Sequence, residues 1–546
     1  MESENKLSKD KNISRRNYLK YVAGGVVAVA VAGGAGYYLM QSGAPPTPTQ
    51  TTTEAPMTTA QATTSAEWVL TGATSGERAI NAAKHYMELH NIPAGYKIVA
   101  AIPPPARGQW GGDDPTKYIK DFVNATGLTV EAIDMPIEQI RSKLTAEATA
   151  KSGAVDLYQI IPASWVADFA EMGLAQQLDD WVTKYDPEFD HGPNRIIPTK
   201  MANENKYNGH WYASTLDYDV WFLNYRSDVM EDPKEQDAFK SKYGYELKPP
   251  TTWAQLYDEC EFFYRPKANP PMYGWWTLKN PVWELIEYKE RLASRGVHYF
   301  DDDMHPLINS DPAIEALQDE VAIQKFQPPE SYTGFWDQMY DFFWKKKIVM
   351  CSVWTSLKHF GYSQGVGDLT KGALNPGYAT KDGTVRSAGM LALDNSIFVN
   401  ANGKNPELAY LFMQYYLDAD VSAKWLLDPG GWYEMFRLSH FDATKYPDIT
   451  KVWGADFSAI MLENAADWFV PDYTMQGSTR YDDALDKQLN AVLKGAADPK
   501  KAMDSVAAEW EKITDELGRD KQKAIWADIK AHQYGAKLRP LMDPNL

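Results

Sequence analysis

Two carboxylates flank an aromatic residue near the middle of the chain: Asp217, Tyr218 and Asp219. Alternate residues of a strand share one face, so both carboxylates point the same way if this stretch is extended. Charged carboxylates accept strong hydrogen bonds, and the hydroxyl groups of a small ligand are suitable donors. The spacing therefore predicts a binding role for these residues. The alternative is a polar strand end that faces solvent.

Aromatic residues are unusually frequent, with 19 tryptophans and 32 tyrosines. Sugar rings present flat C–H faces that pack on indole, and several tryptophans fall in loops at the ends of expected strands. The excess points toward a carbohydrate ligand. Trp275, Trp276 and the Gly431–Trp432 pair are candidates for such contacts. The alternative for each is a tryptophan that only fills a core.

Other motifs in the sequence give weaker evidence of function. Residues 361–365 match G-x-S-x-G, but the hydrolase elbow must lie directly between a strand and a helix. Gly367 and Gly372 follow closely, so we expect a chance match. The run Asp301–Asp303 predicts a solvated loop, with a loose calcium site as the alternative. The sequence has no phosphate-binding loop, HExxH motif or dinucleotide fingerprint, so we expect no cofactor.

Length and charge narrow the function classes. A chain of 546 residues is too long for one ordinary core and predicts two lobes or domains. A formal net charge of −18 argues against nucleic acid as a partner, because phosphates repel an acidic body. Cys260 and Cys351 are far apart and form no CxxC pair, so a structural zinc site is not expected. One disulfide and two buried thiols both remain open.

The N-terminal residues predict an export signal and a tether. Residues 14–20, Ser-Arg-Arg-Asn-Tyr-Leu-Lys, resemble a twin-arginine signal at the end of a cytoplasmic segment, 1–20. Residues 21–40 hold no charge and are long enough to span a bilayer, as a retained anchor or a cleaved signal. Residues 41–66 form a Thr/Pro-rich stalk. The basic residues precede the apolar run, so we expect the body at the extracytoplasmic face of the cell membrane.

Hydrophobic periodicity predicts strands and helices in alternation along the first part of the body. Strands are expected over 96–102, 128–133 and 154–161, and helices over 79–89, 118–124 and 139–150. This order predicts a parallel sheet with helices on both faces. Ligands of such sheets lie beyond the carboxyl ends of the strands, here at the loops 103–110 and 162–165.

The rest of the chain continues the mixture. Strands are expected over 219–225, 348–353 and 390–399, and helices over 252–263, 281–294, 312–325, 406–417 and from 481 onward. Prolines in the first turn start several of these helices. No internal repeat is found, so an α/β fold without repeated units is expected.

Five segments, taken in order, resemble the family 1 extracellular solute-binding proteins, which include maltose-binding protein. They are residues 155–174, 207–226, 249–253, 347–354 and 493–502. The likeness covers roughly residues 95–515. Two features depart from the family pattern: Ser214-Thr215 stand near the place of a family proline, and residues 266–276 are rich in proline and aromatics.

The resemblance implies a two-lobed, periplasmic-binding-protein-like α/β fold of type II with a ligand cleft between the lobes. Lobe 1 is expected from residues 67–216 and 385–430, and lobe 2 from 217–384 and 431–546. Strands are expected to cross between lobes near 216–220, 381–391 and 430–436. Trp165 and Trp354 match the aromatic positions of the family's cleft, and Asp217 and Asp219 lie at the first crossing.

The implied function is capture of a sugar or oligosaccharide and its delivery to the membrane permease of an ABC transporter, by a monomer without enzymatic activity. Two alternatives stay open. One is a surface enzyme acting on polysaccharide, because the many carboxylates leave a glycosidase pair possible. The other is the same binding fold with a non-sugar solute.

Overall fold

A parallel sheet forms where the sequence predicts one. The computed structural model describes residues 68–391 and 394–546. In it β1 (Lys97–Ile102) pairs in parallel with β2 (Thr129–Asp134) on one side and with β3 (Leu157–Ile160) on the other. Apolar residues fill β1 and β3, and prolines follow both strands, because proline has no N–H to continue a ladder. The predicted alternation of strands and helices is confirmed here.

Two later strands complete this sheet, whose order is β2-β1-β3-β13-β6. The strand β13 (Ser396–Val399) runs antiparallel to both β3 and β6 (Ser214–Thr215). The expectation of a purely parallel sheet is therefore wrong at one strand. The reason is connectivity: β13 enters the sheet from the opposite edge, after an excursion of the chain into the second sheet.

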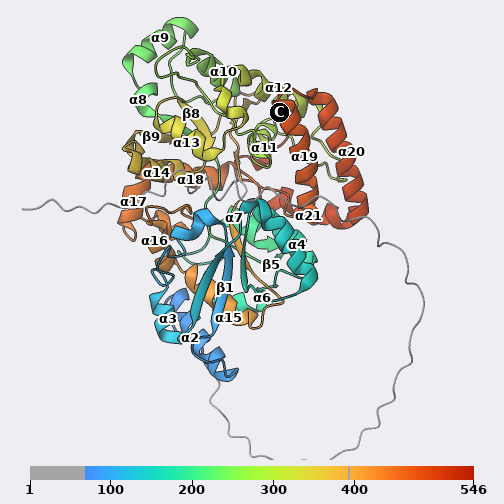
Figure 1. Ribbon diagram of the computed structural model, residues 1–546. Helices are drawn as coiled ribbons and strands as arrows, with labels where there is room; N and C mark the ends of the chain where they lie inside the picture. The colour runs from blue at the N-terminus through green and yellow to red at the C-terminus, as the bar shows by residue number, and fades with distance from the viewer. Residues whose placement is uncertain (1–67, 392–393) are drawn as a thin grey trace, which may run out of the picture. The chain divides into compact units, whose positions relative to one another are not determined.

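Helices cover the five-stranded sheet on both faces (Figure 1). The helix α2 packs along α15, and α15 also contacts β13. The helices of this part are α2 (Ser75–Leu89), α3 (Lys120–Thr126), α4 (Ile140–Ala150), α5 (Val166–Glu171), α6 (Asp179–Tyr185), α7 (Pro198–Lys200), α15 (Pro406–Tyr416) and α16 (Ala419–Leu426). A short hairpin, β4 (Lys206–Tyr207) with β5 (His210–Trp211), lies beside them.

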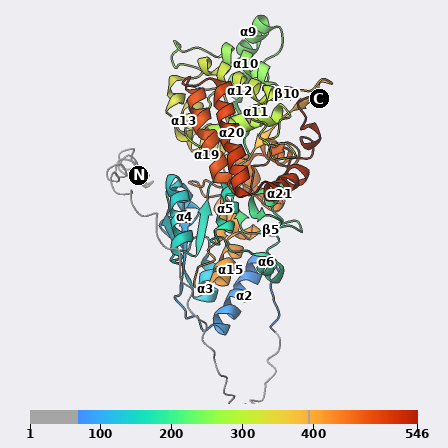
Figure 2. The ribbon, with the colours of Figure 1, turned by 90° about the vertical axis from the view of Figure 1, so that its right-hand side faces the viewer.

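A second, three-stranded sheet of order β8-β7-β9 forms the other part of the described chain. Its strands are β7 (Phe222–Arg226), β8 (Met350–Val353) and β9 (Thr370–Ala373), all antiparallel. The helices in this part are α8 (Ser227–Met230), α9 (Pro233–Tyr243), α10 (Trp253–Phe262), α11 (Glu284–Ser294), α12 (Asp311–Ile323), α13 (Trp336–Trp344), α14 (Ser356–Gly361), α17 (Pro447–Trp453) and α18 (Ala455–Asp467). In Figure 1 this sheet and α10 lie above the five-stranded sheet and α2, and Figure 2 again shows α10 above α2.

The C-terminal helices pack on this second part (Figure 2). They are α19 (Ser478–Leu493), α20 (Pro499–Leu517) and α21 (Arg519–His532). The apolar stripe expected from residue 481 onward is buried, with Leu485, Leu489 and Val492 in one core with Trp510 of α20. Two-residue strands pair nearby: β10 (Tyr378–Ala379) with β11 (Val385–Arg386), and β12 (Gly389–Met390) with β14 (Phe469–Val470).

The chain passes between the two sheets more than once. The first passage joins β6 to β7 over residues 216–221, and the second leads from β12 to β13. Among the described residues no helix is both long and apolar enough to span a bilayer. The predicted N-terminal segments, residues 1–66, lie outside the described residues.

Candidate functional site

Several crossing segments meet at one edge of the five-stranded sheet. Ser396 pairs with Ile160 of β3 on one side and with Thr215 of β6 on the other. The residues that follow β3 and β6, and the residue that precedes β13, therefore lie at a shared edge. This is the carboxyl edge of the parallel strands, where α/β sheets meet their ligands. The first passage, with Asp217 and Asp219, begins here.

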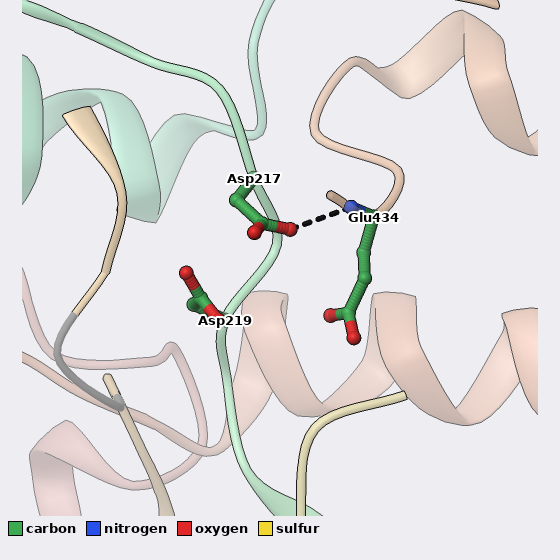
Figure 3. A group of neighbouring side chains, drawn as sticks. All are labelled: Asp217, Asp219 and Glu434. Carbon is green, nitrogen blue, oxygen red and sulfur yellow. Dashed lines mark hydrogen bonds between the residues drawn. The ribbon is translucent and has the colours of Figure 1, made fainter. Parts of the chain in front are cut away.

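Asp217 and Asp219 come together with a third carboxylate, that of Glu434 (Figure 3). One oxygen from each side chain lies within 4.8 Å of the other two, and all three residues are buried. The Glu434 backbone N–H donates to Asp217 Oδ1 at 2.6 Å, so the cluster joins the first passage to a segment more than 200 residues away. Glu434 lies inside the crossing predicted near residues 430–436, but it is not among the predicted site residues.

The backbone at the two aspartates is not a regular strand. Asp219 has φ 40°, in the left-handed region, and β7 begins only at Phe222 instead of at 219. The expected strand over 219–225 is therefore wrong at its start. Asp217 and Asp219 reach one cluster because the chain turns at Asp219, and aspartate tolerates that conformation better than a branched residue does.

A series of hydrogen bonds, all donated in the same direction, connects this carboxylate cluster to the five-stranded sheet. Trp110 Nε1 donates to Tyr433 Oη (3.1 Å), which donates to Gln159 Oε1 (2.6 Å). Gln159 Nε2 donates to Asn395 Oδ1 (2.7 Å), and Asn395 Nδ2 donates to both aspartates, at 2.6 and 3.2 Å. Since an indole N–H only donates and a carboxylate only accepts, both ends fix the direction of the chain and the orientation of each amide.

A buried lysine lies beside the cluster. Lys200 Nζ contacts Asp394 Oδ2 at 2.7 Å and Glu204 Oε1 at 2.9 Å, and it donates to the Tyr218 carbonyl. Burial raises the pKa of Asp394 to about 7, although the Lys200 ammonium opposes the shift. Lys200 and Glu204 are four residues apart on a helical turn, a spacing that brings their side chains onto one face. This spacing is the signal that could have found them in the sequence.

Burial raises the pKa of all three clustered carboxyl groups. Burial, then the charges of Asp219 and Glu434, raise the pKa of Asp217 well above its ordinary range. Burial raises the pKa of Asp219 to about 6 against the opposing Lys200 charge. Burial and the Asp219 charge raise the pKa of Glu434 to about 8. Three negative charges brought together out of water repel one another, and the site favours whatever adds positive charge.

Tryptophans line the neighbouring edge of the second sheet. Phe222 of β7 pairs with Val353 of β8, so the residues just outside the pair, Trp221 and Trp354, lie side by side. Trp354 meets Trp221 edge to face, with ring centroids 5.1 Å apart and planes at 87°, and it meets Trp283 in the same way at 5.2 Å. The predicted Trp354 is thus the centre of a three-tryptophan cluster next to the carboxylates.

Several polar atoms around these segments are buried without a hydrogen-bond partner among the described residues. They are Ser164 Oγ, Trp165 Nε1, Trp221 Nε1, Thr355 Oγ1 and Glu434 Oε2. Buried polar groups in proteins are nearly always paired, by water if not by protein, so each of these atoms needs an explanation. Trp165 lies just past the carboxyl end of β3, in the loop at 162–165 where the sequence predicts a bound ligand.

The other predicted site residues are placed differently. Trp275 lies in the core of the second part and donates to Glu287 Oε2 at 3.2 Å, while Trp276 packs edge to face on Phe342. Tyr218 donates to the Met461 carbonyl oxygen at 2.6 Å and is fully buried.

The Gly431–Trp432 pair is held against the first part of the chain. The Trp432 N–H donates to Gln109 Oε1 at 2.7 Å, and a Cβ on Gly431 would lie 2.7 Å from the Asp428 carbonyl oxygen. Glycine therefore fits at position 431 because the Asp428 carbonyl, three residues earlier, leaves no room for a Cβ. The φ angle of Gly431 does not lie in the left-handed region. The pair lies two residues before Glu434 and so borders the carboxylate cluster.

The competing motifs have structural roles. Residues 361–365 follow the helix α14, and Ser363 is an exposed residue that donates to the Phe360 carbonyl oxygen, so the nucleophile elbow is absent at this place. The run at 301–303 is a loop whose Asp302 and Asp303 pair with Lys530 and Lys523. Cys260 and Cys351 are both buried free thiols.

Comparison with known proteins identifies the family. The sequence matches the model described as bacterial extracellular solute-binding protein over residues 112–423, more than half of the chain. A search of curated protein sequences found no match.

Solved structures with the same fold include an ABC transporter solute-binding protein from Agrobacterium radiobacter K84 in complex with ribitol. Its TM-score is 0.62 at 20% identity, over 77% of this chain and 100% of that one. Maltose-bound MalE3 of T. maritima gives 0.61 at 17% identity, over 77% and 100%. The GacH receptor of Streptomyces glaucescens, solved unliganded and with acarbose, gives 0.59 at 17% identity, over 78% and 100%. The structural similarity to these proteins establishes the fold and confirms the predicted two-lobed α/β class.

The order of the strands, their shared carboxyl edge and the match to the family model lead to the same assignment. The chain belongs to the bacterial extracellular solute-binding proteins.

Proposed function

We propose that this protein captures a sugar or oligosaccharide outside the cytoplasm and delivers it to the membrane permease of an ABC transporter. The observation that carries the proposal is the set of tryptophans and unpaired polar atoms at the junction of the two sheets. Trp354 and Trp221 offer apolar ring surface, while Trp165 Nε1, Trp221 Nε1 and Thr355 Oγ1 have no regular hydrogen-bond partner in the part of the chain that the structure describes. A polyol offers both C–H faces for the rings and hydroxyls for the polar atoms.

The ligands of structural neighbours support this choice. Proteins with this fold were solved with ribitol, alpha-D-tagatose and D-mannitol, each of which carries several hydroxyl groups. We propose that lobe 1 is built on the five-stranded sheet and lobe 2 on the three-stranded sheet. The ligand then lies between Trp165 of the first lobe and Trp354 of the second.

A thermal-shift screen tests the proposal. The purified full chain is heated with a panel of monosaccharides, sugar alcohols and oligosaccharides, with peptides and polyamines as the non-sugar arm. A ligand that binds the native state alone raises stability by RT ln(1 + [L]/Kd), so the correct sugar raises the unfolding midpoint in a concentration-dependent way. Stabilisation by the non-sugar arm alone contradicts the proposed ligand class, and product formed from a labelled oligosaccharide contradicts a pure binding role.

The finer localisation is part of the same proposal. We propose that residues 21–40 are retained as a membrane anchor and that residues 41–66 form a stalk, which holds the body near the permease at high effective concentration. Protease added to intact cells is expected to release the body into the medium. A body that stays fully protected, while it is digested in lysed cells, contradicts an external location.

A further inference from the structure

Negative charge at the junction exceeds the positive charge that reaches it. The carboxylates of Asp217, Asp219 and Glu434 lie together out of water. Lys200 acts on both aspartates, but its ammonium already contacts Asp394 and Glu204, two further buried carboxylates. A buried anion is stable only when it is paired, coordinated to a metal or neutralised by a proton, so three such carboxyls side by side favour the binding of a cation.

A second observation points to a ligand at this place. Glu434 is 1% exposed, and while its Oε1 accepts from the Ser356 N–H, its Oε2 has no hydrogen-bond partner among the described residues. The hydroxyl of Thr355, the residue before Ser356, is also buried; it lies beside the Glu434 carboxyl and has no hydrogen-bond partner of regular geometry among the described residues. The Glu434 carboxylate thus has one oxygen with a hydrogen bond and one without, and it lies beside two further carboxylates. The second oxygen is free to coordinate a cation.

The geometry points to a divalent cation, and we propose that Asp217, Asp219 and Glu434 bind Ca²⁺ at the junction of the two sheets. Oxygen-only ligands select a hard cation. The three ligand oxygens all lie within 4.8 Å of one another, so one cation can contact them together. Ca²⁺ accepts several protein oxygens in a flexible geometry, whereas Mg²⁺ usually keeps most of its waters. Figure 3 shows Asp217 and Asp219 on one segment of the chain and Glu434 on a second segment beside it.

A cation here joins segments from distant parts of the chain. Asp217 and Asp219 belong to the first passage, and Glu434 lies on a segment whose Tyr433 is bonded to Gln159 of β3. Through Ser356, Glu434 also contacts the residues that follow β8 of the second sheet. The ion therefore stiffens the junction about which the two sheets are connected. The inference concerns the cation alone and stands whether or not the ligand is a sugar.

Calcium and terbium titrations of the full chain, solubilised in detergent and free of sugar, test the site. After treatment with a chelator, Ca²⁺ is expected to raise the unfolding midpoint of the wild type. Tb³⁺, a luminescent Ca²⁺ substitute, is expected to show emission sensitised by the nearby Trp221, and Ca²⁺ is expected to displace it. Asp219→Asn and Glu434→Gln are expected to weaken Ca²⁺ binding at least tenfold.

Two features separate a cation site from a merely structural role. In chelator, both amide variants are expected to be at least as stable as the wild type, because each removes repulsion between buried charges; a structural role predicts that they are less stable. Asp303→Asn, in the exposed acidic loop at 301–303, is the matched control and is expected to keep the full calcium response. The proposal is wrong if Ca²⁺ leaves the chelated wild type unchanged, or if Asp219→Asn and Glu434→Gln respond to Ca²⁺ as the wild type does. Because no sugar is present, failure here is distinct from failure of the sugar screen.

Discussion

At the scale of single residues, the buried tryptophans differ in whether the indole N–H group has a hydrogen-bond partner. In the cores, Trp510 donates to the Tyr481 carbonyl oxygen and Trp526 to that of Phe300. Trp165 and Trp221, at the junction of the sheets, are also buried, but their N–H groups have no hydrogen-bond partner among the described residues. Trp276, Trp453 and Trp468 share this property, so an unpaired N–H alone does not mark a ligand site. A buried donor left without a partner costs about 1–3 kcal/mol, so a bound hydroxyl that accepts this hydrogen bond recovers that energy.

Truncation of the junction tryptophans tests this difference. Trp165→Ala or Trp354→Ala is expected to weaken sugar binding by about 1–3 kcal/mol, because each removes apolar ring contact with the ligand. Trp181→Ala is the control, since Trp181 packs on Tyr410 of α15, away from the junction. Calorimetric titration of the three variants gives the affinities. Equal affinities in the wild type and both junction variants would remove these tryptophans from the site.

Buried histidine makes the fold sensitive to acid. Burial lowers the pKa of His359 to about 4, and its ring lies 5.0 Å from that of Trp453. The unfolded chain therefore binds more protons than the folded one between about pH 4 and 6.5, and the free energy of unfolding is lost as pH falls through that window. The loss is up to about 1.4 kcal/mol per pH unit. His359→Gln is expected to reduce this slope in chemical denaturation measured at pH 4.5, 5.5 and 6.5. An identical slope in the variant would show that other groups carry the effect.

At the scale of elements, one helix end is capped from another part of the chain. The N-terminus of α19 is bound by Asp168 of α5: Gly477 N–H donates to Oδ1 at 2.6 Å, and Thr479 donates to Oδ2 through its N–H at 3.2 Å and its hydroxyl at 2.8 Å. An N-terminal cap is usually supplied from within the helix's own sequence. Here α5, beside the five-stranded sheet, caps a helix that packs on the second part, so the cap also holds the two parts together.

Removal of this cap is expected to loosen the molecule. Asp168→Ala loses three hydrogen bonds at a helix end, about 1–3 kcal/mol, and is expected to broaden the distance distribution in small-angle scattering. Asp498→Ala is the matched control, because Asp498 caps α20 through the Lys501 N–H only three residues away. The control is expected to lose stability without a change in dimensions. The same distance distribution in both variants would leave Asp168 an ordinary cap.

The sequence predicts the strands of the first sheet and several of the long helices, but it misses α9, α18 and the two-residue strands. The strands β1, β2 and β3 span four to six residues between helices, so hydrophobic periodicity is sufficient to place them. The strands β6 and β12 have two residues each, too few to show a period. The left-handed turn at Asp219 leaves too weak a signal to predict, because aspartate tolerates this conformation but seldom adopts it.

At the scale of the whole molecule, the site is assembled by passages of the chain between two sheets. Asp217 and Asp219 are candidates from the sequence because they are two residues apart, whereas Glu434 and Asn395 join them only through tertiary structure. Spacing in the sequence carries no information about such contacts. The two-lobed arrangement itself is foreseen from the order of the five family segments, since that order reflects the connectivity of the fold.

Ligand binding is expected to change the dimensions of the molecule. A ligand that contacts Trp165 on one side and Trp354 on the other binds the closed arrangement better than an open one and shifts the population toward it. Small-angle scattering of the full chain with a saturating sugar is expected to give a smaller radius of gyration than without it. Trp354→Ala is expected to need more sugar for the same change. A radius that does not respond to a sugar known to bind contradicts closure.

The position of β13 in the five-stranded sheet has a consequence for biosynthesis. This strand lies between β3 and β6, yet it follows β6 in the sequence by about 180 residues. At about 5–20 residues per second, a ribosome needs roughly 10–40 s to add them. During that time the nascent chain has made β3 and β6 but not the strand that pairs with both, so their edges are open to wrong partners. The five-stranded sheet therefore cannot finish folding until β13 has been translated. The strand order alone creates the need for a chaperone that shields the edges of β3 and β6 until then.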